Sequence, residues 1–144
     1  MTKFLGVVMI VLALVLAIAP VFTDCESQGK TLTTAEGKTV SMKCHWTGIA
    51  EIAAALPLAI AGVYALLGRR KETMRFAAIV GAASGVMAIL LPTVLIGTCM
   101  SASMYCNVVM KPIVLISGIL AIVASIALFF TAREPEPPAA TPAA

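Results

Sequence analysis

The chain has 144 residues, of which 60% are hydrophobic and only 12% are charged, and its mean hydropathy is +1.03. Soluble domains average about 45–50% apolar and about 25% charged residues, so no soluble fold could hide this excess, and the bilayer must be the solvent for most of the chain. The net charge of +3 comes from basic residues that form no continuous face, which excludes a nucleic-acid partner.

Four apolar runs, each about as long as the roughly 20 residues that cross a bilayer as a helix, predict four transmembrane spans. They cover residues 4–22, 48–68, 76–98 and 112–132. The first run contains Ala17-Ile18-Ala19, which imitates a signal-peptide cleavage site, but Pro20 would block the cut and the run is long, so we expect a retained span. The length allows one bundle, over residues 1–133, and no second domain.

Small residues in these spans favour close helix packing, because lipid offers no hydrophobic drive for helix association. The third span carries Gly81 and Gly85 in a GxxxG pattern, and the fourth carries Gly118. This weak motif favours packing inside the bundle over homodimerisation. The predicted fold class is an all-α integral membrane protein, a four-transmembrane-helix bundle.

Basic residues in the short loop between the second and third spans predict the orientation. Arg69, Arg70, Lys71 and Arg75 lie in this loop, which the positive-inside rule assigns to the cytoplasm. An even number of spans then places both termini inside, in the cytoplasmic membrane of a prokaryote. The tail over residues 134–144, rich in Pro and Ala, is predicted to be disordered.

The first outer loop carries the signal of a small extracytoplasmic β-hairpin. Residues 30–34 and 38–43 alternate and are rich in Thr and Val, with Glu36-Gly37 between them. The hairpin would bring Cys25 and Cys44 near its base. Trp46, at the start of the second span, is predicted to be an aromatic anchor at the membrane interface.

All four cysteines, Cys25, Cys44, Cys99 and Cys106, fall in the two outer loops. Cysteines on the oxidising side of a membrane commonly form disulfides, so we predict two bridges. Pairing within each loop, Cys25–Cys44 and Cys99–Cys106, is the simplest arrangement, whereas cross-loop pairing would link the two loops. The sequence leaves this choice open.

Two other kinds of chemistry compete with structural disulfides. Thiol–disulfide exchange, with a quinone as cofactor, is disfavoured because the chain has no Cys-x-x-Cys motif. A soft-metal site suits Cu(I), although no standard ligand spacing is present and methionines at a membrane boundary are commonly apolar filler. The candidate ligands are Met42, Cys44, His45, Cys99, Met100, Met104 and Cys106.

Three polar residues near the outer ends of the spans are candidates for function. Glu51 lies about one turn inside the second predicted span, where ionisable groups are costly and commonly functional. Alternatively, Glu51 occupies the first turn of its helix, favoured by the helix dipole, and reaches water or pairs with Lys111 at the head of the fourth span. His45 could titrate near neutral pH.

The stretch Met42-Lys43-Cys44-His45-Trp46-Thr47, followed by Glu51, resembles a motif of an uncharacterised bacterial and archaeal membrane family, the domain of unknown function 4418. The resemblance implies four spans over most of the chain and importance for Cys44, His45 and Glu51, but it implies no substrate. The resemblance also implies an association of the protein with ABC-type transporter components, which favours the role of an accessory subunit.

No catalytic triad, nucleotide-binding loop or carboxylate dyad is present in the sequence. We therefore predict a non-enzymatic accessory or scaffold protein that associates with another membrane complex, such as a transporter permease, and needs no cofactor. The alternative is an outer-face thiol-redox or copper-handling protein that uses the loop cysteines, methionines and histidine.

Overall fold

Four long helices and a short hairpin make up the computed structural model, which describes residues 1–27, 29, 31–68, 70–101 and 103–132. The predicted disordered tail at residues 134–144 lies outside the described residues, as does Arg69. In chain order the elements are α1 (Thr2–Thr23), β1 (Leu32–Thr33), β2 (Thr39–Val40), α2 (Lys43–Leu67), α3 (Lys71–Leu90), η1 (Leu91–Leu95), η2 (Cys106–Met110) and α4 (Lys111–Thr131). The two π-helical turns η1 and η2 prolong α3 and precede α4.

All four helices are long and apolar enough to cross a membrane, which confirms the predicted four-helix architecture. With the π-turns included they have 22 to 26 residues and mean hydropathies of 1.9 to 3.0, against the roughly 20 residues that a crossing needs. Large apolar side chains such as Phe4, Leu56 and Phe130 are exposed on the outside of the bundle. Such a surface is suited to lipid.

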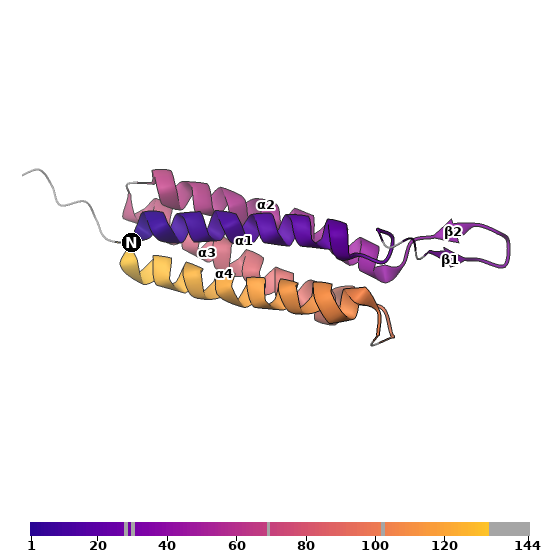
Figure 1. Cartoon of the computed structure of the whole chain (residues 1–144). Helices are drawn as coiled ribbons and strands as arrows, with labels where there is room; N and C mark the ends of the chain where they lie inside the picture. Colours follow the sequence, from indigo (N-terminus) through magenta and orange to yellow (C-terminus); the bar gives the residue numbers. More distant parts are fainter. Residues whose placement is uncertain (28, 30, 69, 102, 133–144) are drawn as a thin grey trace, which may run out of the picture.

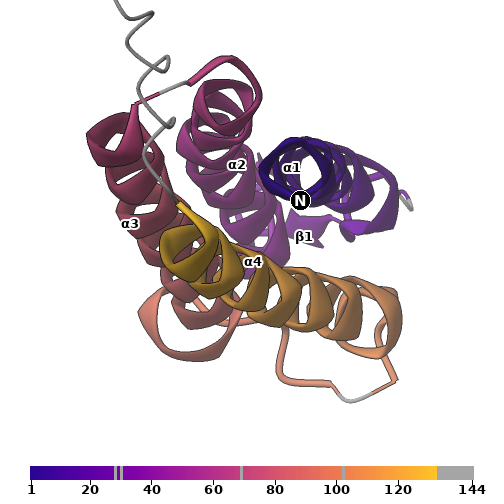
Figure 2. The same ribbon diagram turned by 90° about the vertical axis from the view of Figure 1, so that its left-hand side faces the viewer.

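The helices pack as a ring in which each contacts its neighbours in the chain and α1 closes against α4 (Figure 1; Figure 2). The N-terminus and the connection between α2 and α3 lie at one end of the bundle. The hairpin and the connection between η1 and η2 lie at the opposite end, and we call this the cysteine end. It comprises the described residues within 24–47 and 96–110.

Paired glycines set the closest helix contacts. A Cβ atom on Gly85 would lie 2.9 Å from the carbonyl oxygen of Gly118, and a Cβ atom on Gly118 would lie 3.0 Å from that of Gly85. Gly6 and Gly62 make the same reciprocal contact between α1 and α2, at 2.9 and 3.0 Å. The predicted use of Gly85 and Gly118 in packing within the bundle is therefore confirmed.

The predicted β-hairpin is present as a two-stranded antiparallel sheet with Leu32 opposite Val40 and Thr33 opposite Thr39. Gly37 has a φ of 78°, a conformation that glycine adopts without steric penalty, and it turns the chain between the strands. The hairpin projects beyond the helices (Figure 1), and all four strand residues are exposed.

Candidate functional site

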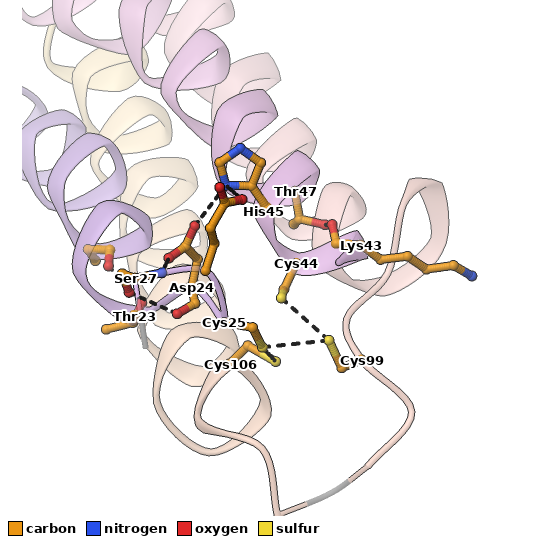
Figure 3. A network of polar contacts seen from close by, with 12 residues as sticks. Thr23, Asp24, Cys25, Ser27, Lys43, Cys44, His45, Thr47, Cys99 and Cys106 are labelled. Atoms are coloured by element: carbon orange, nitrogen blue, oxygen red, sulfur yellow. Dashed lines mark hydrogen bonds and ion pairs between the residues drawn. The ribbon is translucent and has the colours of Figure 1, made fainter. Parts of the chain in front are cut away.

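The four cysteines converge on one point at the cysteine end (Figure 3). Cys44 Sγ lies 3.4 Å from Cys99 Sγ, Cys25 Sγ lies 3.5 Å from Cys106 Sγ, and Cys25 Sγ lies 3.7 Å from Cys99 Sγ. All four sulfur atoms are within 4.8 Å of one another. Three of the cysteines are buried, and Cys99 is partly exposed. The sequence placed all four in loops at one end but did not predict a single cluster.

Each cysteine comes from the end of a different helical segment. Cys25 follows the last turn of α1, Cys44 lies in the first turn of α2, and Cys106 begins η2. Cys99 follows η1, where Gly97, with a φ of 80°, turns the chain. The N-terminal ends of α2 and of η2–α4 therefore adjoin the cluster, and the positive ends of helix dipoles stabilise thiolates.

The distances between the sulfur atoms can be compared with those of a disulfide and with those of a metal site. A disulfide requires an S–S distance of about 2.05 Å, and the four thiols are free. The two shortest sulfur–sulfur contacts each join a cysteine of the first outer loop to a cysteine of the second. The simplest pairing expected from the sequence was instead within each loop. The predicted disulfides and their pairing stay predictions. A tetrahedral ion with metal–sulfur bonds of about 2.3 Å separates its ligands by about 3.8 Å, which is close to the observed distances.

Burial and the neighbouring thiols together disfavour a free thiolate at Cys25. Desolvation raises the pKa of Cys25 strongly, and contacts with the sulfurs of Cys44, Cys106 and Cys99 raise it further. A metal ion reverses this preference, because it supplies the positive charge that a group of buried thiolates lacks. Binding of a cation by these thiols would therefore require that they release protons.

Two polar side chains hold the Cys99 segment against the helices. The Thr47 hydroxyl lies 2.7 Å from the carbonyl oxygen of Gly97 and donates to it, which ties this segment to α2. The Asn107 amide donates to the carbonyl oxygens of Cys99 and Ser101, at 2.6 and 2.9 Å. Both contacts fix the position of the one partly exposed cysteine.

His45 lies next to Cys44 in the chain, but its ring faces away from the sulfurs (Figure 3). Its Nδ1 is 2.9 Å from Asp24 Oδ2 and 3.1 Å from Glu26 Oε2. Burial raises the pKa of Asp24, but hydrogen bonds from His45 and Ser27 outweigh burial, so that the net pKa is lowered from 3.8. His45 therefore braces the first loop and is not part of the cluster of sulfurs. Cys25, which was not among the metal-ligand candidates, is part of that cluster.

The expected first-turn position of Glu51 and its pairing with Lys111 are wrong. Helix α2 begins at Lys43, five residues before the predicted start at residue 48, so Glu51 lies about 12 Å along the helix. Its side chain is fully buried. Neither carboxylate oxygen has a hydrogen-bond partner among the described residues, while Lys111 is only half-buried at the start of α4.

The predicted methionine candidates lie beside the cluster rather than inside it. Met42 Sδ is 3.9 Å from Cys99 Sγ, and Met100 and Met104 line a pocket together with Met42 and Cys99. Trp46 is more than half exposed at the start of α2, where an interface anchor would lie; that role stays a prediction.

The positioning roles of Asp24, Thr47 and Asn107 were not predicted from the sequence, although Thr47 ends the stretch that resembles the family motif. Asp24 contacts His45 and Thr47 contacts Gly97, both far away in the chain. Asn107 bonds to residues six to nine positions earlier, in the connection before η2, and no recognised motif marks that spacing. One signal was available, because each lies within three residues of a cysteine.

A family model described as a domain of unknown function (DUF4418) matches residues 4–131, from the first turn of α1 to the last residue of α4. The chain belongs to this family. The matched region includes the whole four-cysteine cluster and the residues that brace it. No curated protein and no solved structure matches the chain.

Proposed function

We propose that this DUF4418 protein binds a single soft metal ion through Cys25, Cys44, Cys99 and Cys106 at the outer face of the membrane. The observation that carries the proposal is the convergence of four free thiols, all within 4.8 Å, from four separate chain segments. Four thiolates around one ion favour Zn²⁺ or Cu(I), whose ligand preferences include sulfur.

The surroundings of the cluster support a metal site over an accidental group of thiols. Helix N-termini from α2 and η2 adjoin it, which favours the deprotonated ligands that a metal needs. Hydrogen bonds from Thr47 and Asn107 fix the segment that carries Cys99. Such bracing of ligands by surrounding groups is typical of metal sites.

The distribution of arginine supports an outer position for the cluster. Arg70 and Arg75 lie near the α2–α3 connection, at the end of the bundle opposite the cysteines (Figure 1). The acidic residues Asp24, Glu26 and Glu36 lie at the cysteine end. By the positive-inside rule, the cysteine end then faces outward and both termini face the cytoplasm.

The test is metal titration of the reduced full-length chain in lipid nanodiscs under anaerobic conditions. Co²⁺ is the first probe, because thiolate-to-cobalt charge-transfer absorption reports sulfur coordination, followed by competition with Zn²⁺ and Cu(I). We expect one ion per chain and loss of the absorption in each of Cys25→Ser, Cys44→Ser, Cys99→Ser and Cys106→Ser. Ser103→Ala, in the same exposed loop, is the control and should titrate like the unmodified chain.

A second measurement addresses the thiols in the native membrane. Cells are quenched in acid, denatured and labelled with a mass-tagged maleimide before and after a chelator and after a reductant. Thiols that react without reductant support the metal site. Two complete disulfides, together with no metal uptake after reduction, would refute it and return the cysteines to a structural role.

Thiol–disulfide exchange is the second candidate, favoured by the short contacts Cys44–Cys99 and Cys25–Cys106 across the two loops. Oxidation of one such pair would form an S–S bond and release two protons and two electrons, which a quinone could accept. Disulfides that cycle upon addition of a quinone, in the second measurement, would favour this function over the metal site. The accessory role beside a transporter permease stays a prediction.

A further inference from the structure

A pocket at the cysteine end opens directly onto Cys99. Its volume is about 430 Å³, and it is lined by Leu32, Met42, Lys43, Thr98, Cys99, Met100, Ser101 and Met104. We call it the methionine pocket. Cys99 is the only member of the four-cysteine cluster that lines it, and also the only one that is not buried.

The methionine pocket is connected to the cluster through a sulfur–sulfur contact. Met42 Sδ lies 3.9 Å from Cys99 Sγ, close to the roughly 3.8 Å that separates two sulfur ligands of one tetrahedral ion. Cys99 Sγ in turn lies 3.4 Å from Cys44 Sγ. Thioether and thiol sulfurs thus form a continuous path from the pocket to the buried cysteines.

The chemistry of this path distinguishes between soft ions. A thioether is uncharged and has no proton to lose, so it binds a cation without the proton displacement that a thiol requires. Thioethers select Cu(I), whereas Zn²⁺ prefers thiolate, imidazole and carboxylate ligands. Lys43 also lines the pocket, but its side chain extends away from the cysteines (Figure 3).

We infer that the methionine pocket is the entry site through which Cu(I) reaches the four-cysteine cluster, with Met42 passing the ion to Cys99. This inference rests on the proposed function and deepens it, because it names Cu(I) as the cargo and Cys99 as the first thiol to receive it. The transfer is an exchange of ligands at constant oxidation state. The Cys99 thiol loses its proton to solvent as its sulfur binds the ion.

The experiment compares the rate of loading with the equilibrium affinity. The reduced full-length chain in nanodiscs is mixed in a stopped-flow instrument with the Cu(I) complex of a chromophoric chelator, and transfer is followed by chelator absorbance. The variant is the double substitution Met42→Leu and Met104→Leu, which nearly conserves side-chain volume. Met87→Leu is the matched control, because Met87 is exposed on α3 and does not line the methionine pocket.

We expect the double variant to load Cu(I) about tenfold more slowly, the lower end of the range seen when groups around a metal site are replaced. Its equilibrium affinity for Cu(I) and its loading rate with Zn²⁺ should match those of the unmodified chain and the control. An unchanged Cu(I) rate would overturn the entry site while leaving the metal site intact. Equal slowing with both ions would also overturn it, since a loss of packing would affect both.

Failure of the proposed function gives a different result. In that case the unmodified chain would take up neither ion, so both proposals would be refuted before any variant is compared.

Discussion

At the scale of single residues, the properties of the cluster depend on side chains that do not belong to it. Asn107 donates two hydrogen bonds to the backbone of the Cys99 segment, and Thr98 bonds to the Asn107 amide oxygen. Asn107 therefore helps Thr47 to fix the position of the partly exposed Cys99 thiol, without carrying a ligand atom itself.

Replacing Asn107 with Leu, a side chain of similar shape, should loosen the Cys99 segment. We expect the metal affinity to fall by about tenfold, as is common when groups that orient ligands are removed, and maleimide to modify Cys99 faster. Competition titration and labelling kinetics measure the two effects, with Ser103→Ala as the control. Unchanged affinity and labelling would mean that Thr47 alone holds the segment.

Asp24 makes the bracing of the first loop sensitive to acid. Because the pKa of Asp24 is lowered in the folded chain by His45 and Ser27, against the opposing effect of burial, its ionised form is the one that stabilises the fold. This contribution is complete above the ordinary pKa of 3.8 and is lost as the pH falls through the lower value of the folded chain.

Cleavage of residues 24–42 by an acid-active protease such as pepsin measures this loss. We expect the loop to become cleavable as the pH falls from about 4 to about 2, beyond the change in the activity of pepsin on an unfolded substrate, whereas Asp24→Asn should follow the activity of pepsin alone. Identical pH profiles for the two proteins would show that Asp24 does not brace the loop.

The fully buried carboxyl group of Glu51, which has no hydrogen-bond partner among the described residues, is expected to destabilise the bundle. An unsatisfied buried polar group costs about 1–3 kcal/mol, so Glu51→Leu should raise the free energy of unfolding in mixed micelles by a similar amount. Glu51→Gln is the matched control, because it keeps the volume and polarity and should change stability less. A loss of stability in Glu51→Leu would show that the carboxyl group has a partner in the membrane.

At the scale of elements, the glycine contacts explain how four apolar helices pack without a hydrophobic drive. A Cβ on Gly85 would meet both the Gly118 carbonyl oxygen, at 2.9 Å, and Ile122 Cγ1, at 2.8 Å. Only a glycine lets α3 and α4 approach so closely.

Gly85→Val should therefore separate α3 from α4 and destabilise the bundle by about 1–3 kcal/mol, the usual effect of overpacking. Denaturant titration in mixed micelles measures the change. Ala53→Val, on the exposed side of α2, is the control and should be nearly neutral. If Gly85→Val leaves stability unchanged but abolishes a dimer, the motif serves homodimerisation instead.

Sequence patterns predicted these elements well where the signal was local. Apolar runs identified the four helices, and the turn at Gly37 identified the hairpin. The start of α2 was missed because its first turn, from Lys43 to Thr47, is largely polar. The apolar run that identifies the span begins only after this turn. Glu51 was consequently placed one turn too shallow.

The sequence singled out the four cysteines, as disulfide candidates, but did not predict that they form one cluster. All four cysteines were assigned to one end, yet their convergence depends on how the ends of α1, α2, η1 and η2 meet in space. The turn at Gly97 and the hydrogen bonds of Asn107 cannot be read from spacing, because they join the Cys99 segment to other elements. The contacts of the His45 ring with Asp24 and Glu26 could not be read from spacing for the same reason.

At the scale of the whole molecule, the proposed function requires that the cysteine end face outward. The arginines Arg70 and Arg75 lie near the α2–α3 connection, at the end of the bundle opposite the cysteine end, which carries the lysines Lys38 and Lys43 (Figure 1). Positive charge is commonly retained in the cytoplasm during insertion, so residues far from the cysteine cluster predict the orientation that the proposed function requires.

Thiol labelling of intact cells tests this orientation. After treatment with an impermeant reductant and a chelator, a membrane-impermeant maleimide should modify Cys99, the partly exposed cysteine, without cell lysis. In a variant with all four cysteines replaced by serine, Glu72→Cys introduces an exposed thiol in the first turn of α3, beside the α2–α3 connection, where labelling should require lysis. If Glu72→Cys were labelled in intact cells and Cys99 were protected, the orientation would be the reverse, and the proposed metal site would lie in the cytoplasm. The cluster would then meet a reducing compartment, where free thiols persist, and the source of its metal would be cytoplasmic.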